Sequence, residues 1–351
     1  MNKVPAIVLG GSGYVAGELL RLLAGHPHLE VAGVMSESRA GSAIRDTFPQ
    51  LQNTLGNLAF GTRQTLLATL ASGRCALFSA APHGASAALI GEFIEQADAC
   101  GCELTVVDVS ADFRYSNAGT YAAVYGQPHG APQLLGRFAS ALPEHLPATD
   151  KPHIGHPGCF ATALLIAAVP LMKLGLTESD LYAFGITGST GSGRTPAAGT
   201  HHPERQSNLF AYKPLGHRHA PEVSGICATI TGKRPALHFV PHSGPFSRGI
   251  HMTVQAQLAG DTPVGDIRRA LQEFYAGCEF ISVRDGTPKI KNVVGSNYCH
   301  VGVAAEAGTV AVFVVIDNLV KGAAGGAVQW MNRKLDFDET AGLTAPALAW
   351  T

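Results

Sequence analysis

The feature that most constrains the fold is a glycine-rich turn between a short apolar run and a helix-like segment near the N-terminus. Residues 6–9 predict a strand, Gly10-Gly11-Ser12-Gly13 a turn, and 14–24 a helix that His26-Pro27 ends. Residues 29–34 predict a second strand. A strand–turn–helix–strand unit of this size is the βαβ unit, which requires a parallel pair of strands.

Two more apolar runs with a helical segment between them extend this pattern. They are 75–78 and 105–109, and the helical segment is 85–97. Alternating strands and helices predict a doubly wound parallel sheet.

The pattern changes after about residue 150, and the second half predicts an α+β domain with a mixed sheet. The predicted helices there are 159–173 and 319–335, and the predicted strands are 181–187, 238–240, 249–258 and 310–316. The expected fold class is therefore α/β, with a doubly wound parallel-sheet domain followed by a second, mixed-sheet domain.

Charge and cysteine content exclude several functional classes. The chain has 351 residues with 25 basic and 26 acidic side chains, so no overall positive charge is present to hold nucleic acid or an anionic membrane. Its longest apolar run, 163–172, is too short to span a bilayer. Seven scattered cysteines without a C-x-x-C pair argue against a disulfide scaffold or a zinc ribbon and favour a reducing, cytoplasmic setting.

The glycine turn predicts a dinucleotide site. Gly11-x-Gly13-x-x-Ala16 follows a strand and opens a helix, whose first N–H groups suit a pyrophosphate. After the second strand, Ser36, Ser38 and Arg39 could hold a 2′-phosphate and favour NADP, whereas Glu37 would favour NAD. The loop after residue 79, with Ala81 and Pro82, is expected to line the same cleft.

The sharpest chemical signal is a cysteine placed after a Pro-Gly turn at the start of an apolar helix. A thiol in the position of Cys159 has a lowered pKa and can act as a nucleophile, although a lone cysteine is often only a small buried hydrophobe. His217 and His219, followed by Glu222, offer an acid or base near neutral pH. Zinc is a weaker alternative for the histidines, because no further ligand stands at zinc spacing, and no metal is expected.

Two further segments could bind anions. Gly188 to Thr195 nearly matches a P-loop, but the helix that a P-loop needs does not follow it, so a flexible loop beside the cleft fits better. Arg114 could clamp a phosphate or carboxylate, or could instead pair with Asp112.

Together these motifs resemble the N-acetyl-γ-glutamyl-phosphate reductase family over nearly the whole chain. The segments that carry the resemblance are GGSGYVAGEL from Gly10, DVSADFR from Asp108, YGQP from Tyr125, PGCFAT from Pro157, GSTGSGR from Gly188, HRHAPE from His217, FVPHSGPFSRGI from Phe239, GSNYCHVG from Gly295 and DNLVKGAAGGAVQ from Asp317. The chain departs from the family pattern at Ala16, where glycine is usual, and at Pro128-His129, where Pro-Glu is common.

The resemblance implies a Rossmann domain of residues 1–150 plus 317–351 and a catalytic and dimerisation domain of 151–316, with the C-terminal helix packed on the first sheet. It implies a homo-oligomer, dimer or tetramer, acting on a small molecule. It also implies that the thiolate of Cys159 attacks N-acetyl-γ-glutamyl phosphate, that NADPH reduces the thioester to the semialdehyde, and that His217 or His219 is the acid/base. Of the two histidines we favour His217, and His219 stays the alternative.

The resulting candidate site residues fall into three groups. The catalytic candidates are Cys159, His217 and His219; the cofactor candidates are Gly10, Gly11, Ser12, Gly13, Tyr14, Val15, Ser36, Ser38, Arg39, Ala81, Pro82, Ser189, Gly191 and Asn318; the substrate candidates are Arg114, Ser192, Arg194 and Glu222. The alternatives are an aminoadipyl-phosphate reductase of lysine biosynthesis, an NADP-binding regulatory protein without chemistry, and a Cys-His hydrolase, which would leave the glycine turn unexplained.

Overall fold

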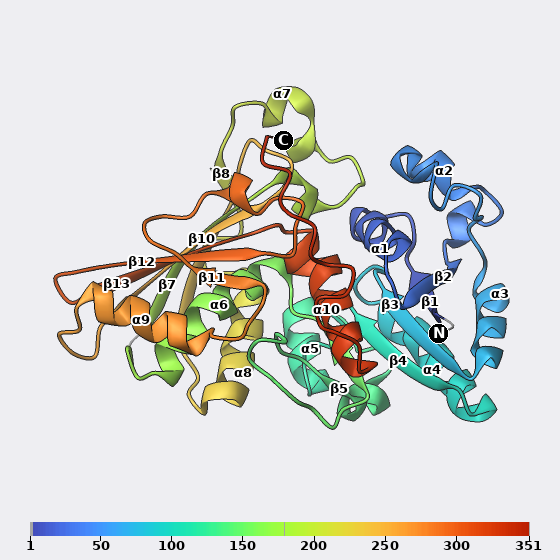
Figure 1. Ribbon diagram of the computed structural model, residues 1–351, viewed down its shortest axis with the longest axis horizontal. Coiled ribbons are helices and arrows are strands. Elements are labelled where there is room, and N and C mark those ends of the chain that lie inside the picture. The colour runs from blue at the N-terminus through green and yellow to red at the C-terminus, as the bar shows by residue number, and fades with distance from the viewer. Residues whose placement is uncertain (1–2, 179, 351) are drawn as a thin grey trace. The chain divides into compact units, whose positions relative to one another are not determined.

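The chain passes back and forth between two folded units in the computed structural model, which describes residues 3–178 and 180–350 (Figure 1). The first unit comprises residues 3–140, 148–156 and 323–344, and the second comprises 141–147, 157–322 and 345–350. The main crossings, at 156/157 and 322/323, each lie six residues after an expected domain boundary, at 150/151 and 316/317. The last segment belongs to the second unit because the Leu348 N–H donates to the Val294 carbonyl, 3.0 Å away.

The first unit is built on a six-stranded, entirely parallel sheet of order β2-β1-β3-β4-β6-β5. The strands are β1 (Val4–Leu9), β2 (Leu29–Val34), β3 (Arg74–Ser79), β4 (Glu103–Asp108), β5 (Phe138–Ala139) and β6 (His153–Gly155). The parallel sheet predicted from the alternation of strands and helices is therefore confirmed.

Helices cover both faces of this sheet. On one face α1 (Tyr14–Ala24) and α10 (Gly325–Lys334) contact each other and the strands, so the expected return of the C-terminal helix is confirmed for α10. On the other face Ile7 and Leu9 of β1 share a core with α4 (Ser86–Cys100), since side chains alternate across a strand. The shorter helices of this unit are α2 (Ile44–Thr47), α3 (Arg63–Leu67) and α5 (Ala118–Tyr125).

The second unit carries a seven-stranded mixed sheet of order β11-β12-β13-β10-β7-β9-β8. The strands are β7 (Leu181–Thr187), β8 (Phe210–Ala211), β9 (Leu237–Ser243), β10 (Ile250–Gln257), β11 (Ile281–Val283), β12 (Cys299–Glu306) and β13 (Thr309–Ile316). The pairs β7–β9 and β11–β12 are parallel and the others are antiparallel, as expected for a mixed sheet. The sequence prediction had not included β8, β11 and β12.

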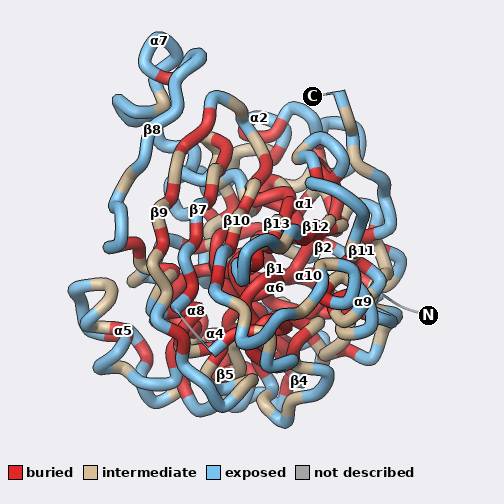
Figure 2. The backbone as a smooth tube through the Cα atoms, turned by 90° about the vertical axis from the view of Figure 1, so that its left-hand side faces the viewer, coloured by how far each residue is buried: buried red, intermediate tan, exposed pale blue. Residues whose placement is uncertain are grey.

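Three helices pack on one face of this sheet, as Figure 1 shows: α6 (Cys159–Lys173), α8 (His219–Thr231) and α9 (Val264–Phe274). Helix α6 is buried from residue 160 to 172, because its side chains are apolar all round. The predicted bounds of α6 and β7 are confirmed residue for residue. By contrast, the segment that carries α7 (His202–Arg205) and β8 is exposed almost throughout (Figure 2).

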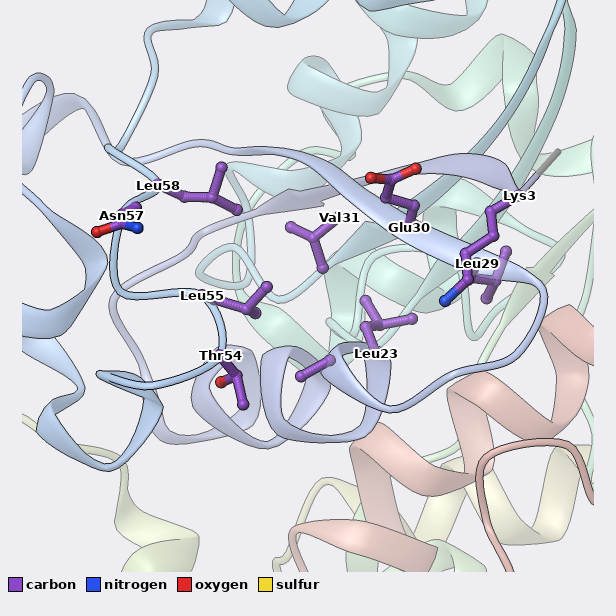
Figure 3. A pocket seen from close by; sticks show the side chains of 10 residues that line it. Lys3, Leu23, Leu29, Glu30, Val31, Thr54, Leu55, Asn57 and Leu58 are labelled. Carbon is purple, nitrogen blue, oxygen red and sulfur yellow. The ribbon is translucent and has the colours of Figure 1, made fainter.

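A cavity of about 470 Å³ lies in the first unit, where apolar side chains of α1, β2 and the loop 51–58 point toward one another (Figure 3). Lys3 and Leu29, which line it, stand at the amino ends of β1 and β2. The glycine turn follows the carboxyl end of β1, so this cavity is not the cofactor cleft of a doubly wound sheet. Within residues 3–178 and 180–350, no helix is long and apolar enough to cross a membrane.

Candidate active site

The glycine turn lies where the strand order of the first sheet reverses. Strand β1 has β2 on one side and β3 on the other, and this switch point is where doubly wound sheets bind ligands. Gly10 has a φ of +70°, and a Cβ there would lie 2.5 Å from the Cα and N of Ala81. The turn and the loop after β3 therefore press together, and only glycine fits between them.

The start of α1 has the form of a pyrophosphate site. Gly13 caps the helix without a side-chain hydrogen bond, and a Cβ on it would meet nothing within 4 Å. Tyr14 and Val15 form the first turn, whose N–H groups carry the positive end of the helix dipole. The close packing usually given to the third glycine of the motif falls on Gly17, where a Cβ would lie 2.8 Å from the Phe48 ring. The methyl group of Ala16 is thus tolerated, and these residues fit a dinucleotide.

The segment after β2 is the place for the ribose end of such a cofactor. Glu37 accepts a hydrogen bond from the Arg63 main-chain N–H at 3.2 Å, so its carboxylate is already engaged. Ser38 and Arg39 are exposed, while Ser36 is buried. Among the residues that the structure describes, no carboxylate lies within 4.0 Å of the Arg39 guanidinium, which leaves its charge available to a phosphate.

The acidic residues of the DVSADFR segment fasten the loop that carries Ala81 and Pro82. Asp108 accepts hydrogen bonds from the hydroxyls of Ser86 and Ser110, at 2.9 and 2.7 Å. Burial, and then the neighbouring Asp112, raise the pKa of Asp108 to about 6. Asp112 itself accepts from the main-chain N–H groups of residues 84 and 87. These carboxylates fix the main chain of the loop that follows β3.

Arg114 is turned toward the main chain. Its Nε donates to the His156 carbonyl and its Nη2 to the Val109 carbonyl, each at 2.9 Å. His156 is the last residue of the first unit before the chain enters the segment of Cys159. Arg114 therefore supports the main chain that leads to the cysteine, and its binding of a substrate anion stays a prediction.

Cys159 is the first residue of α6 and is half-buried. Gly158, the N-cap, donates its N–H to the Glu222 Oε1 at 2.8 Å. A helix of this length places positive potential at its first residue, which favours a thiolate. Other cysteines are chemically different, because burial raises the pKa of Cys75 and of Cys227 to about 12.

The two candidate histidines lie beside Phe160, the residue after Cys159. The ring centroids of His217 and His219 are 5.8 and 6.3 Å from that of Phe160 and 4.7 Å from each other. Burial, helped by the charges of Arg218 and Lys213, lowers the pKa of His217 to about 4, so the ring is neutral near pH 7. The His219 main-chain N–H donates to the His217 Nδ1 at 3.2 Å. The proton of His217 is therefore on Nε2, which is a hydrogen-bond donor.

Three residues around Cys159 have roles that the sequence did not reveal. Glu222, expected to bind substrate, is 1% exposed and holds the N–H of the residue before the cysteine. Gly322 packs against the Cys159 side chain. The Tyr212 ring lies 5.7 Å from that of His217, and burial, with the charge of Cys159 as a second cause, raises the pKa of Tyr212. Only the spacing of Tyr212 before the His-Arg-His segment could have pointed to it.

The glycine- and serine-rich loop after β7 is fastened at its first residues and exposed further on. Ser189 donates its N–H to the Phe246 carbonyl at 2.9 Å. The Asn318 amide donates to the Thr190 hydroxyl at 3.1 Å and its oxygen accepts from the Gly249 N–H at 2.8 Å. Beyond them, the predicted ligand residues Gly191, Ser192 and Arg194 are exposed. After this loop the chain forms only short helical turns, at Ala198–Thr200 and His202–Arg205.

The structure thus groups the predicted residues in two sets, one in each unit. The glycine turn, the 2′-phosphate candidates and Arg114 belong to the first unit, whereas Cys159, both histidines and Asn318 belong to the second. Within residues 3–178 and 180–350, no three His, Cys, Asp or Glu side chains are arranged to hold a metal ion.

Comparison with known families identifies both units. Residues 5–137 match the family described as semialdehyde dehydrogenase, NAD binding domain, and residues 159–318 match semialdehyde dehydrogenase, dimerisation domain. Together these matches define the class of protein as a semialdehyde dehydrogenase of two domains. Curated relatives refine it: an N-acetyl-gamma-glutamyl-phosphate reductase of Pseudomonas putida and one of Azotobacter vinelandii are each 40% identical over 97% of this chain and 98% of theirs. The chain belongs to the N-acetyl-gamma-glutamyl-phosphate reductase family.

Solved structures support the fold alone, because their sequences are distant. Aspartate semialdehyde dehydrogenase II of Vibrio cholerae, complexed with ASA, matches with a TM-score of 0.70 at 14% identity over 96% of this chain and 99% of that one. Aspartate semialdehyde dehydrogenase with NADP from Candida albicans matches with a TM-score of 0.68 at 17% identity over 95% and 99%. The expected pairing of a Rossmann domain with a mixed-sheet domain is confirmed.

Proposed function

We propose that this chain reduces N-acetyl-γ-glutamyl phosphate to N-acetyl-glutamate 5-semialdehyde with NADPH, releasing phosphate, as a step of arginine biosynthesis. The reductases named above support this substrate, since this chain matches 98% of the length of each. The observation that carries the proposal is the position of Cys159 as the first residue of a long helix, with the N–H before it held by a buried carboxylate. A thiolate is the nucleophile that an acyl phosphate requires.

The chemistry follows from the residues around the thiol. The Cys159 thiolate forms a bond to the acyl carbon, and phosphate leaves with the electron pair of the broken C–O bond. Bound NADPH supplies the hydride that reduces the resulting thioester. His217 holds its proton on Nε2 and donates a hydrogen bond to the oxygen that becomes negative. When the C–S bond breaks, its electron pair returns to Cys159, whose thiolate the helix dipole stabilises.

The preference for NADPH rests on the segment after β2. Among the described residues no carboxylate pairs with the exposed guanidinium of Arg39, which stands beside Ser38, whereas Glu37 is engaged by the Arg63 main chain. Arginine is the residue that receives a 2′-phosphate in this fold. Gly10, Gly11 and Gly13 would hold the pyrophosphate at the start of α1, and the loop of Ala81 would close the other side.

The second unit supports a homodimer. The sheet face opposite its three helices carries Tyr182, 49% exposed, and Phe184, 45% exposed, on the interior strand β7. Large exposed aromatic side chains on one sheet face indicate an interface, and the matching domain family is one of dimerisation domains. Phe184→Glu should shift the mass measured by light scattering from dimer to monomer. A wild-type monomer would refute this part of the proposal.

The compartment is inferred from the thiols. All seven cysteines lie among the described residues and none forms a disulfide. Free cysteines in this number are typical of reducing compartments, so we place the protein in the cytoplasm.

The test runs the reaction backwards. The purified protein is mixed with N-acetyl-glutamate semialdehyde, phosphate and NADP, and absorbance of the reduced nicotinamide is followed. A rise that requires phosphate supports the proposal, and Cys159→Ser should abolish it while leaving NADPH binding unchanged. No rise despite NADPH binding would refute this substrate. Aminoadipate semialdehyde run in parallel identifies the longer-chain activity, and inertness toward both indicates a regulatory protein.

A further inference from the structure

We infer that Gly322 is a positioning residue, which fixes the nucleophile Cys159 by packing against its Cα and Cβ. The role of that thiol rests on the function proposed above. A Cβ built on Gly322 would lie 2.8 Å from the Cys159 Cβ and 3.1 Å from its Cα. Neither atom can rotate away, because both are fixed to the first turn of α6. Any side chain at position 322 must therefore move the cysteine or the turn that carries Gly322.

The turn that carries Gly322 is fixed by a buried carboxylate. Gly322 donates its N–H to the Asp317 carbonyl at 3.0 Å. The Asp317 carboxylate accepts the N–H groups of Leu319 and Val320, at 2.8 and 2.9 Å. Arg248 in turn holds this carboxylate with two nitrogens, at 3.0 and 3.1 Å. With Asp317 fully buried, this network leaves the turn little freedom to retreat from the cysteine.

Gly322 lies within a π-helical segment, Val320–Ala324. Such widened turns are frequent at functional sites. Asn318, in the same turn, also bonds the Thr190 hydroxyl of the loop after β7. One short segment therefore contacts the nucleophile with Gly322 and fastens a neighbouring loop with Asn318.

The cysteine is fixed from the other side as well. The N–H of Gly158 is held by Glu222 at 2.8 Å, and the Gly158 carbonyl accepts the Thr162 N–H at 2.7 Å. Cys159 therefore lies between a bonded main chain and the bare Cα of Gly322. A displaced nucleophile loses rate because effective concentration depends on near-attack geometry.

Backbone strain does not explain the need for glycine here. The φ of Gly322 lies outside the left-handed region, so alanine can adopt the same backbone conformation. In a helical turn alanine is otherwise favoured over glycine. The effect of Gly322→Ala is consequently assigned to the contact with Cys159.

The experiment compares Gly322→Ala with Gly265→Ala, a control at an exposed position of helix α9 where a Cβ meets nothing within 4 Å. We expect Gly322→Ala to lower kcat by about 100-fold, the loss that a misplacement of about 1 Å produces, with the KM for NADPH unchanged. The pH profile of iodoacetamide alkylation, followed on the Cys159 peptide without substrate, should shift. Gly265→Ala should change neither quantity.

A double-mutant cycle tests the contact without any activity. Cys159→Gly removes the Cβ that the alanine methyl would strike, so Gly322→Ala should lower Tm far less in that background than in the wild type. Equal Tm losses in both backgrounds, or wild-type kcat and alkylation in Gly322→Ala, would overturn the inference. If Gly322→Ala does not fold, the double variant must fold, and its failure would also overturn it. If instead the proposed function is wrong, the wild type will be inactive in the assay, while the double-mutant cycle in Tm still shows the contact between Gly322 and Cys159.

Discussion

Replacing Glu222 by alanine separates a positioning role from a substrate-binding role. The Glu222 carboxylate is 1% exposed, and its Oε1 accepts the Gly158 N–H at 2.8 Å, one residue before Cys159. A hydrogen bond to a charged group contributes about 1.5–3 kcal/mol. If all of it acts through the position of the thiol, kcat falls about 10- to 150-fold, since about 1.4 kcal/mol is tenfold in rate.

The assay is initial-rate kinetics in the forward direction, with kcat and the KM for the acyl phosphate determined separately. Glu222→Ala should lower kcat and leave KM nearly unchanged, because the carboxylate faces the main chain. Glu222→Gln keeps an oxygen acceptor and should lose less. A raised KM with unchanged kcat in Glu222→Ala would refute this reasoning and indicate that Glu222 binds the substrate.

Three further outcomes are expected. Arg39→Ala should raise the KM for NADPH without changing the KM for NADH, because the arginine would contact only the 2′-phosphate, which NADH lacks. Equal changes in the two KM values would contradict the NADP assignment. Burial lowers the pKa of His153 to about 3 and that of His217 to about 4, below about 6.5 in the unfolded chain. Stability is therefore complete above pH 6.5 and lost as pH falls toward 3–4, so Tm should drop with acidification, and less so in His153→Phe. The Lys321–Glu144 ion pair is 2.5 Å long and both side chains are 1% exposed, so Lys321→Met should cost about 3–5 kcal/mol in urea unfolding. Adding Glu144→Gln should recover much of that loss.

The local elements of this protein could be predicted from the sequence because neighbouring residues decide them. A helix that ends before Cys159 cannot run through Pro157-Gly158, and the apolar residues after Cys159 form a new helix. The cysteine therefore stands at the start of that helix. The glycine turn between β1 and α1 was equally local, since its φ of +70° at Gly10 demands glycine. Cys159 and the dinucleotide turn were therefore visible in the printed sequence.

The surroundings of the cysteine were decided by the tertiary structure. Glu222 and Gly158 are 64 positions apart, and the HRHAPE segment alone did not reveal that its glutamate faces the main chain. Burial, which only the tertiary structure provides, is the main cause that lowers the pKa of His217. Strand β11 was missed because its three residues form a strand through their pairing with β12, further along the chain, more than through local propensity. Contacts such as that between Gly322 and Cys159 depend on which buried surfaces pack together. Residues far apart in the sequence form them, so no local pattern along the chain predicts them.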